Sequence, residues 1–220
     1  MLDVACGPGY FAAAAAKIGA TPTGVDFSTK MVEEARRRYP GIRFEEGDAE
    51  KLAFGDNEFD AVVLNFGMLH LARPEMAVNE AHRVLRQNGR LAFTVWDTPD
   101  KTAGFGIVLL AIQTHGNMNV AIPSGPPFFR FSDPAESSHV MKHAGFVDIK
   151  VEQVSQVWTL QSADSLFDIM YNGSVRNAAL LRAQTPEALN KIRLEMRERV
   201  EEQKKRLAMP AVLIAGVKGL

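Results

Sequence analysis

The sequence is poor in the features that define several special classes of protein. It has one cysteine, Cys6, in 220 residues, so it can form neither an internal disulfide nor a cysteine-rich zinc site. Its 25 basic and 26 acidic residues give a net charge of −1, which argues against a surface dedicated to nucleic acid or to an anionic membrane. The sequence therefore predicts no nucleic-acid partner, and the cytoplasm is its simplest compartment.

Long hydrophobic runs are also missing. The apolar stretches 12–16 and 105–112 are far too short to span a bilayer, which takes about 20 residues. The N-terminus has an acidic residue at position 3 and no basic segment, so it does not resemble a signal peptide. With 46% hydrophobic and 23% charged residues, the chain has the composition of a soluble globular protein without a membrane span.

Strand-like and helix-like segments alternate through the first two-thirds of the chain. Helical patterns cover residues 10–18, 31–39, 74–85 and 133–145. Short apolar runs predict seven strands, at 1–5, 21–25, 42–46, 59–65, 90–96, 146–154 and 211–217. Such alternation is typical of a parallel sheet with helices on both faces. We therefore predict an α/β fold with a Rossmann-like, doubly wound, mostly parallel seven-stranded sheet.

Two segments do not fit this alternation. Residues 97–130 are rich in glycine, proline and aromatic residues, and we expect them to be irregular. About fifty residues of helical pattern separate the last two predicted strands, far more than a hairpin needs. These residues predict a helical insertion over 155–209 that forms part of a substrate pocket. The rest of the core then comprises residues 1–154 and 210–220.

Polar residues or glycines follow four successive predicted strands. In an open α/β sheet, ligands bind beyond the carboxyl ends of the strands. Glycine lets a ligand approach the backbone closely, and a carboxylate about twenty residues later can accept the hydroxyls of a ribose. The residues concerned are Asp3, Gly7 and Gly9 around the first strand end, then Asp26, Asp48 and Asn65. Together they predict a site for a nucleoside cofactor.

Each of these residues also has a purely structural interpretation. Gly7 and Gly9 could simply form a tight turn, Asp26 could cap the next helix, and Asp48 could be an ordinary loop residue. The aromatic run 128–131 could likewise form a lid over an apolar ligand or anchor its loop to the core. We favour the functional interpretation of the three strand ends because all of them occur at the expected spacing.

Two cofactors compete for this site. The sequence from Gly7 to Ala12 fits the dinucleotide fingerprint, so an NAD(P)-dependent oxidoreductase is one alternative. However, Asp3 lies four residues before the first glycine, where its carboxylate would face a pyrophosphate. It suits a ligand with positive charge, such as a sulfonium amino acid, and Asp48 can accept from an adenine amino group. The charge pattern therefore favours S-adenosylmethionine.

Three motifs in order, at 2–9, 24–31 and 47–52, resemble those of the class I S-adenosylmethionine-dependent methyltransferases. The similarity is to the small-molecule branch that includes the ubiquinone and menaquinone biosynthesis enzymes. It is specific over residues 1–96 and weaker over 133–154 and 211–217. The resemblance implies methyl transfer to a small, partly apolar molecule, with S-adenosylhomocysteine as product.

The resemblance also implies roles for individual residues. Gly7 and Gly9 would line the methionine and ribose, with Ala5 in the same turn and Asp3 near the methionine amino group. Asp26 would hold the ribose hydroxyls. The adenine would lie against Phe27, Met31, Asp48 and Ala49, and the sulfonium and methyl group against Asn65 and Phe66.

His70 follows Asn65 by five residues and is our candidate for a general base near the methyl group. The alternative is that His70 only packs or caps its loop. The chain begins inside the first strand, where relatives usually have a preceding helix that helps to close the site. The insertion or a second subunit, as in a homodimer, could supply this lid. A cofactor-binding protein without turnover is the remaining alternative.

Overall fold

The computed structural model describes residues 1–121 and 126–219, and the chain divides into two compact units. The first unit comprises Met1–Val95, Gly125–Glu152 and Val212–Leu220. The second unit comprises Trp96–Ser124 and Gln153–Ala211. Residues 96–124 thus group with the helical segment, whereas the boundaries predicted from the sequence placed them in the core.

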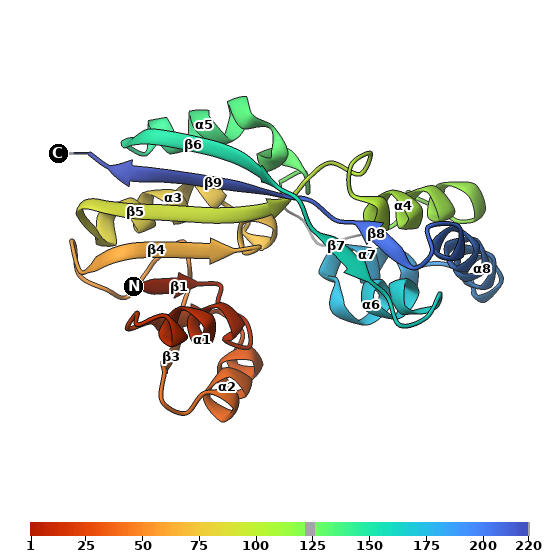
Figure 1. The fold of residues 1–220 in the computed structure, drawn as a ribbon, viewed down its shortest axis with the longest axis horizontal. Helices are drawn as coiled ribbons and strands as arrows, with labels where there is room; N and C mark the ends of the chain where they lie inside the picture. The colour runs from red at the N-terminus through yellow and green to blue at the C-terminus, as the bar shows by residue number, and fades with distance from the viewer. Residues whose placement is uncertain (122–125, 220) are drawn as a thin grey trace. The chain divides into compact units, whose positions relative to one another are not determined.

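The first unit is built on a seven-stranded sheet in the order β3-β2-β1-β4-β5-β9-β6. β1 to β5 pair in parallel, and β9 runs in the opposite direction to its neighbours (Figure 1). The strands are β1 (Leu2–Val4), β2 (Thr23–Asp26), β3 (Arg43–Glu46), β4 (Phe59–Asn65), β5 (Leu85–Trp96), β6 (Phe146–Val154) and β9 (Ala211–Lys218). The strand order turns back between β1 and β4, which confirms the predicted doubly wound, mostly parallel fold.

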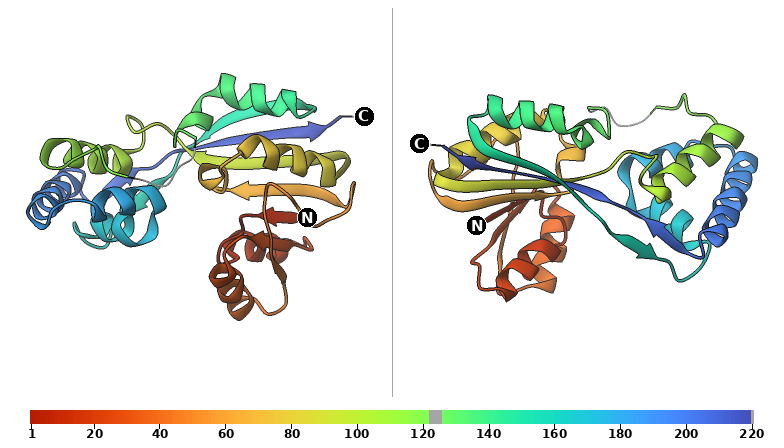
Figure 2. Two further views of the ribbon diagram at one scale, coloured as in Figure 1. Left: turned by 180° about the vertical axis from the view of Figure 1, so that it is seen from behind. Right: turned by 45° about the horizontal axis from the view of Figure 1, so that its top comes forward.

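Helices cover both faces of this sheet. α3 and α5 contact each other on one face, and α1 lies on the other (Figures 1 and 2). α2 packs against β2 and β3. The helical segments of this unit are α1 (Tyr10–Lys17), α2 (Thr29–Arg38), α3 (Pro74–Val84) and α5 (Pro134–His143), with single 3-10 turns η1 (Met68–His70) and η2 (Arg130–Ser132).

Buried and partly exposed residues alternate along the central strands, and the buried ones form one face of the core. In β5, Leu91, Phe93 and Val95 are fully buried, while the residues between them are partly exposed. Phe131 is also buried and meets Phe93 edge to face, with 6.0 Å between ring centroids. Within the aromatic run 128–131, Phe131 therefore anchors its loop to the core.

The second unit contains four helices and a two-stranded antiparallel sheet within the part of the chain that the structure describes. They are α4 (Ala103–His115), β7 (Val157–Thr159), α6 (Ser165–Gly173), α7 (Val175–Arg182), α8 (Pro186–Glu202) and β8 (Arg206–Ala208). The prediction that 97–130 is irregular is wrong over α4. This helix is apolar on most of its circumference, so its sequence lacks the 3.6-residue alternation that marks a surface helix.

No helix in residues 1–121 and 126–219 is both long enough and apolar enough to span a membrane. The spacing of apolar residues predicts one helix over 186–207 whose apolar stripe comprises Leu189, Ile192, Met196, Val200 and Leu207. In the structure α8 ends at Glu202, and Leu207 is a buried residue of β8. Of the predicted stripe, Ile192, Met196 and Val200 are fully buried, whereas Leu189 is partly exposed.

Candidate functional site

The turn after β1 has an unusual backbone. Ala5, Gly7 and Gly9 all have positive φ angles, of 54°, 53° and 82°. A non-glycine residue rarely adopts this conformation, and such strain is concentrated at functional sites. At Gly9 a Cβ atom would also come within 2.7 Å of the Phe44 ring, so this position requires glycine. The turn leads directly into the amino end of α1.

Asp26 joins this turn to the loop after β2. Its Oδ2 accepts a hydrogen bond from the backbone N–H of Gly7 at 2.8 Å, and its Oδ1 accepts from the N–H of Ser28 at 2.9 Å. The side chain is almost completely buried. A carboxylate has about four acceptor positions, so each oxygen can still accept from a ligand hydroxyl.

Asp3 lies beneath the same turn and is 1% exposed. Its Oδ2 accepts from the N–H of Ala12 in α1 at 3.0 Å, whereas its Oδ1 has no hydrogen-bond partner among the described residues. Burial raises the pKa of Asp3 to about 7; the Ala12 N–H opposes this rise and the negative charge of Asp26 adds to it. A buried acceptor without a donor fits a nearby ammonium group, reached directly or through water.

The loops after β1 and β4 meet. Phe66 has a φ of 56°, and a Cβ atom on Gly67 would lie 2.8 Å from the Cβ of Ala5. The Thr94 hydroxyl of β5 donates to Oδ1 of Asn65 at 2.7 Å and accepts from the N–H of Phe66 at 3.0 Å. Two strained residues, Ala5 and Phe66, therefore flank one point of close backbone approach.

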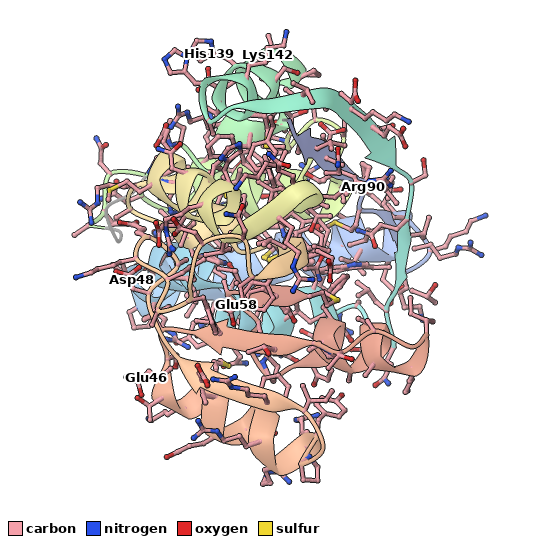
Figure 3. The ribbon with its side chains drawn as sticks, turned by 90° about the vertical axis from the view of Figure 1, so that its left-hand side faces the viewer. Glu46, Asp48, Glu58, Arg90, His139 and Lys142 are labelled. Atoms are coloured by element: carbon pink, nitrogen blue, oxygen red, sulfur yellow. The ribbon has the colours of Figure 1, made fainter. Side chains whose placement is uncertain are left out.

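The loop after β3 is attached to the same edge of the sheet. The N–H of Gly47 donates to the carbonyl oxygen of Asp26 at 3.0 Å. Asp48 is exposed, and its Oδ1 accepts from the N–H of Glu50 at 2.8 Å. Figure 3 shows Asp48 on the same side of the molecule as Glu46, the last residue of β3. Ala49 beside it is buried.

Three other predicted site residues are exposed side chains. Phe27 is 77% exposed and Met31 44% exposed, so two large apolar side chains next to Asp26 stand open to solvent. His70 ends η1 and is also exposed. The structure thus links the turns that contain Asp26, Gly7, Ala5 and Phe66 by direct contacts, and leaves Phe27 and Met31 uncovered beside them.

Sequence reasoning missed the residues that hold these loops in place. Glu50 is buried and accepts from both the backbone N–H and the Nε of Arg73, at 2.7 and 2.8 Å. Arg83 on α3 donates to the carbonyl oxygens of Leu52 and Phe54 and pairs with Glu80. The only sequence signal was the Glu80–Arg83 spacing of three residues on a helix.

Buried Cys6 lies in the glycine turn but is not set up as a nucleophile. Burial raises the pKa of its thiol to about 12, with further contributions from the negative charges of Asp3 and Asp26. A thiol is reactive as the thiolate, so this side chain fills space at neutral pH.

Comparisons with known proteins agree with this geometry. Residues 2–93, from β1 to β5, match the model of a methyltransferase domain. The chain is 40% identical over 99 residues to the demethylmenaquinone methyltransferase of Beutenbergia cavernae. That match covers 45% of this chain and 41% of the relative, so the chain spans about two-fifths of that relative's length.

A longer match is to UbiE, the ubiquinone/menaquinone biosynthesis C-methyltransferase of Rhodopseudomonas palustris. It is 30% identical over 173 residues and covers 70% of this chain and 68% of the relative. Among solved structures, the YcgJ protein of Bacillus subtilis has the same fold, with a TM-score of 0.64, 19% identity and coverage of 100% of this chain and 91% of that protein. The sheet order, the strained glycine turn and these matches together place the chain in the class I S-adenosylmethionine-dependent methyltransferase family.

Proposed function

We propose that this protein binds S-adenosylmethionine and transfers its methyl group to a small, partly apolar molecule. The observation that carries the proposal is the carboxylate of Asp26 at the end of β2, which is held by the N–H groups of Gly7 and Ser28 beside the switch point of the sheet. Asp26 would accept from the ribose hydroxyls, Asp48 from the adenine amino group, and Phe27 and Met31 would pack on the adenine. Asp3, Gly7 and Gly9 would surround the methionine part, and Asn65 and Phe66 would border the methyl group.

The chemistry that S-adenosylmethionine supplies is a methyl group already activated by a sulfonium. The task left to the protein is to orient the acceptor in line with that group and to exclude water. The contact between Thr94 and Asn65 would keep the loop after β4 in one conformation during this step. His70 would take a proton from the acceptor when the acceptor is a hydroxyl or an acidic carbon.

The names of the relatives support an acceptor class. Several are named as demethylmenaquinone or ubiquinone/menaquinone C-methyltransferases. We therefore propose a hydroxylated aromatic ring of the quinol type as the acceptor and a ring carbon as the methylated atom. The helical unit is our candidate for the part that binds the apolar side of this acceptor.

Calorimetric titration with S-adenosylhomocysteine tests the cofactor assignment. We expect Asp26→Ala to weaken binding by at least about tenfold, since it removes hydrogen bonds made to a charged acceptor. Asp60→Ala is the matched control, because Asp60 is an exposed carboxylate at the other end of β4. Tight binding of NAD without binding of S-adenosylhomocysteine would instead support an oxidoreductase.

Turnover requires a separate measurement. Incubation of the protein with methyl-labelled S-adenosylmethionine and a series of quinols should produce a labelled product. Cofactor binding with no label transferred to these quinols or to a mixed metabolite extract would favour a binding protein without turnover. We also propose a cytoplasmic location and a homodimer, and sedimentation of the purified protein tests the second of these.

A further inference from the structure

Two histidines stand one helical turn apart at the end of α5, and we call them the histidine pair. His139 and His143 differ by four positions, so their side chains leave the helix on the same face. Their ring centroids lie 5.0 Å apart, and the ring planes are tilted by 39°. Both side chains are exposed, and Figure 3 shows His139 at the outer surface of α5. Neither imidazole belongs to the proposed cofactor site.

The backbone beneath the histidine pair is fixed by the core. Val140 and Met141, on the inner side of α5, are both buried, and the carboxylate of Asp133 caps the start of the helix. Ligands on a fixed helix lose less conformational freedom on binding an ion than ligands on a mobile loop. Binding at this position therefore has to order only the side-chain torsions of the two histidines.

The separation of the two rings matches that of two imidazoles bound to one metal ion. A zinc–nitrogen bond is about 2.0–2.1 Å long, which puts a bound zinc ion about 3.2 Å from the centre of each ring. With a tetrahedral angle of about 109° between the two bonds, the ring centres are then about 5.2 Å apart. Since the observed separation is 5.0 Å, the histidine pair can bind one ion by rotation of its rings, without movement of α5.

The charges around the histidine pair favour a cation. Both histidines line a pocket of about 200 Å³ together with Glu75 and Arg130. The Arg130 guanidinium lies 2.6 Å from the carboxylates of both Glu75 and Glu136, so one positive charge stands between two negative ones. His143 is also the last residue of α5, where the helix dipole is negative. The exposed cation Lys142 is not among the residues that line this pocket.

Two imidazoles make an open metal site rather than a closed one. Imidazole suits zinc, copper and nickel ions, and two histidines four positions apart on a helix are an established arrangement of zinc ligands. Within residues 1–121 and 126–219, no group of three or more histidine, cysteine, aspartate or glutamate side chains could hold a metal ion. The histidine pair would therefore supply two of the four ligands of a zinc ion, and water would occupy the other positions.

We propose that His139 and His143 together bind one Zn²⁺ ion at the surface of the first unit. The site is separate from methyl transfer, because the histidine pair and the side chains that line its pocket lie outside the proposed cofactor site. The spacing of the two imidazoles exists only while α5 is helical. Zinc therefore binds the folded state alone and stabilises α5 and the unit that contains it.

Calorimetric titration of the untagged full chain with zinc chloride tests the site. We expect one bound ion per chain, and zinc should raise the Tm of the wild-type protein. Either His139→Gln or His143→Gln should raise the Kd for zinc by at least about tenfold, because a chelate loses the gain of its second, intramolecular bond when one ligand is removed. Glutamine is a good helix former, so α5 should persist in both variants, and far-UV circular dichroism checks this.

His115→Gln is the matched control, because His115 is an exposed histidine at the end of another helix, where it pairs with Glu195 at 2.8 Å. It should leave the Kd for zinc unchanged within twofold. NMR of the wild-type protein gives an independent measurement, since the chain has five histidines. The ring-proton signals of His139 and His143 should shift together up to one equivalent of zinc, and the other three histidines should not respond.

Three results would overturn the proposal. The first is an unchanged Kd for zinc in both His139→Gln and His143→Gln, with or without a lower number of bound ions, since each histidine would then act separately or not at all. The second is an equal loss of affinity in His115→Gln, which would place the ion elsewhere. The third is zinc-induced shifts at other histidines before those of the histidine pair. The NMR titration uses the wild-type protein, so it decides the question even if a variant fails to fold.

Discussion

Among single residues, Asp3 is costly for the fold to keep. Its side chain is buried, one carboxylate oxygen has no partner among the described residues, and the neighbouring Asp26 adds repulsion. A buried, unpaired carboxylate destabilises the folded state, and it persists where it serves a ligand. Asp3 therefore links the stability of the fold to the proposed cofactor.

We expect Asp3 to make stability depend on pH. The pKa of Asp3 is raised from 3.8 to about 7 in the folded protein, so between these values the folded state binds more protons than the unfolded state. The contribution of Asp3 to the free energy of unfolding is fully present below about pH 4, and it falls as the pH rises toward 7. The loss is at most about 4 kcal/mol.

Urea unfolding at pH 5, 6, 7 and 8 measures this dependence, and Asp3→Asn should flatten it. Asp48→Asn removes an exposed carboxylate from the same edge of the sheet and should leave the slope unchanged. An equally steep loss of stability in Asp3→Asn would show that another group is responsible.

At the scale of the element, two helices of the first unit begin in different ways. Asp133 caps α5, because its Oδ1 accepts from the N–H of Ala135 at 2.8 Å. Ser28 occupies the same position before α2 but makes no side-chain capping bond within the described chain. Instead, Asp26 accepts from the N–H of Ser28. The sequence allows Ser28 or Thr29 to cap this helix; Ser28 holds the N-cap position without a side-chain capping bond in the described chain, and the Thr29 hydroxyl donates to Glu46 instead.

This difference predicts unequal effects of two similar substitutions. Asp133→Ala should lower the free energy of unfolding by about 1 kcal/mol, the usual cost of losing a cap. Ser28→Ala should change it by less than about 0.5 kcal/mol, because no capping bond is lost. Denaturant unfolding at neutral pH compares the two, and equal losses would contradict the assignment of the caps.

Elements whose apolar residues recur with a clear period were predictable from the sequence, and elements without such a period were not. β6 and α5 were predicted almost to the residue because apolar alternation, Asp133 and Gly145 mark their ends. α4 was missed because Phe105, Ile107, Val108 and Ile112 leave it no polar face. The close approach of Gly67 to Ala5 and the pairing of Glu50 with Arg73 depend on tertiary structure, for which a single sequence holds no signal.

At the scale of the whole molecule, one buried carboxylate ties together the segments of the second unit. Asp97 is 1% exposed, and its oxygens accept from Thr98, Lys101 and Gln153. Its backbone N–H donates to the carbonyl oxygen of Pro210 at 3.1 Å. Burial alone would raise the pKa of Asp97, but these hydrogen bonds, that of Gln153 first, lower it on balance.

We expect Asp97→Ala to destabilise the second unit by about 2–4 kcal/mol. The substitution removes the buried, charged acceptor to which Thr98, Lys101 and Gln153 donate hydrogen bonds. Hydrogen exchange followed by mass spectrometry should show faster exchange in peptides from 98–121 and 154–210. Peptides from residues 1–95 should keep their protection. Asp97→Asn, which keeps the size and one acceptor, should have a smaller effect, and uniform loss of protection across the chain would contradict this assignment.

The insertion of β9 between β5 and β6 has a consequence for biosynthesis. Among the strands that the structure describes, β6 pairs in the finished sheet with β9 alone, and residues 155–210 separate the two strands along the chain. On the ribosome, β6 must therefore wait for this whole stretch to be translated before it has a neighbour, and the edge of β5 stays open for the same time. Such a nascent chain offers two free strand edges to chaperones, and to other copies on the same messenger, until β9 closes the gap.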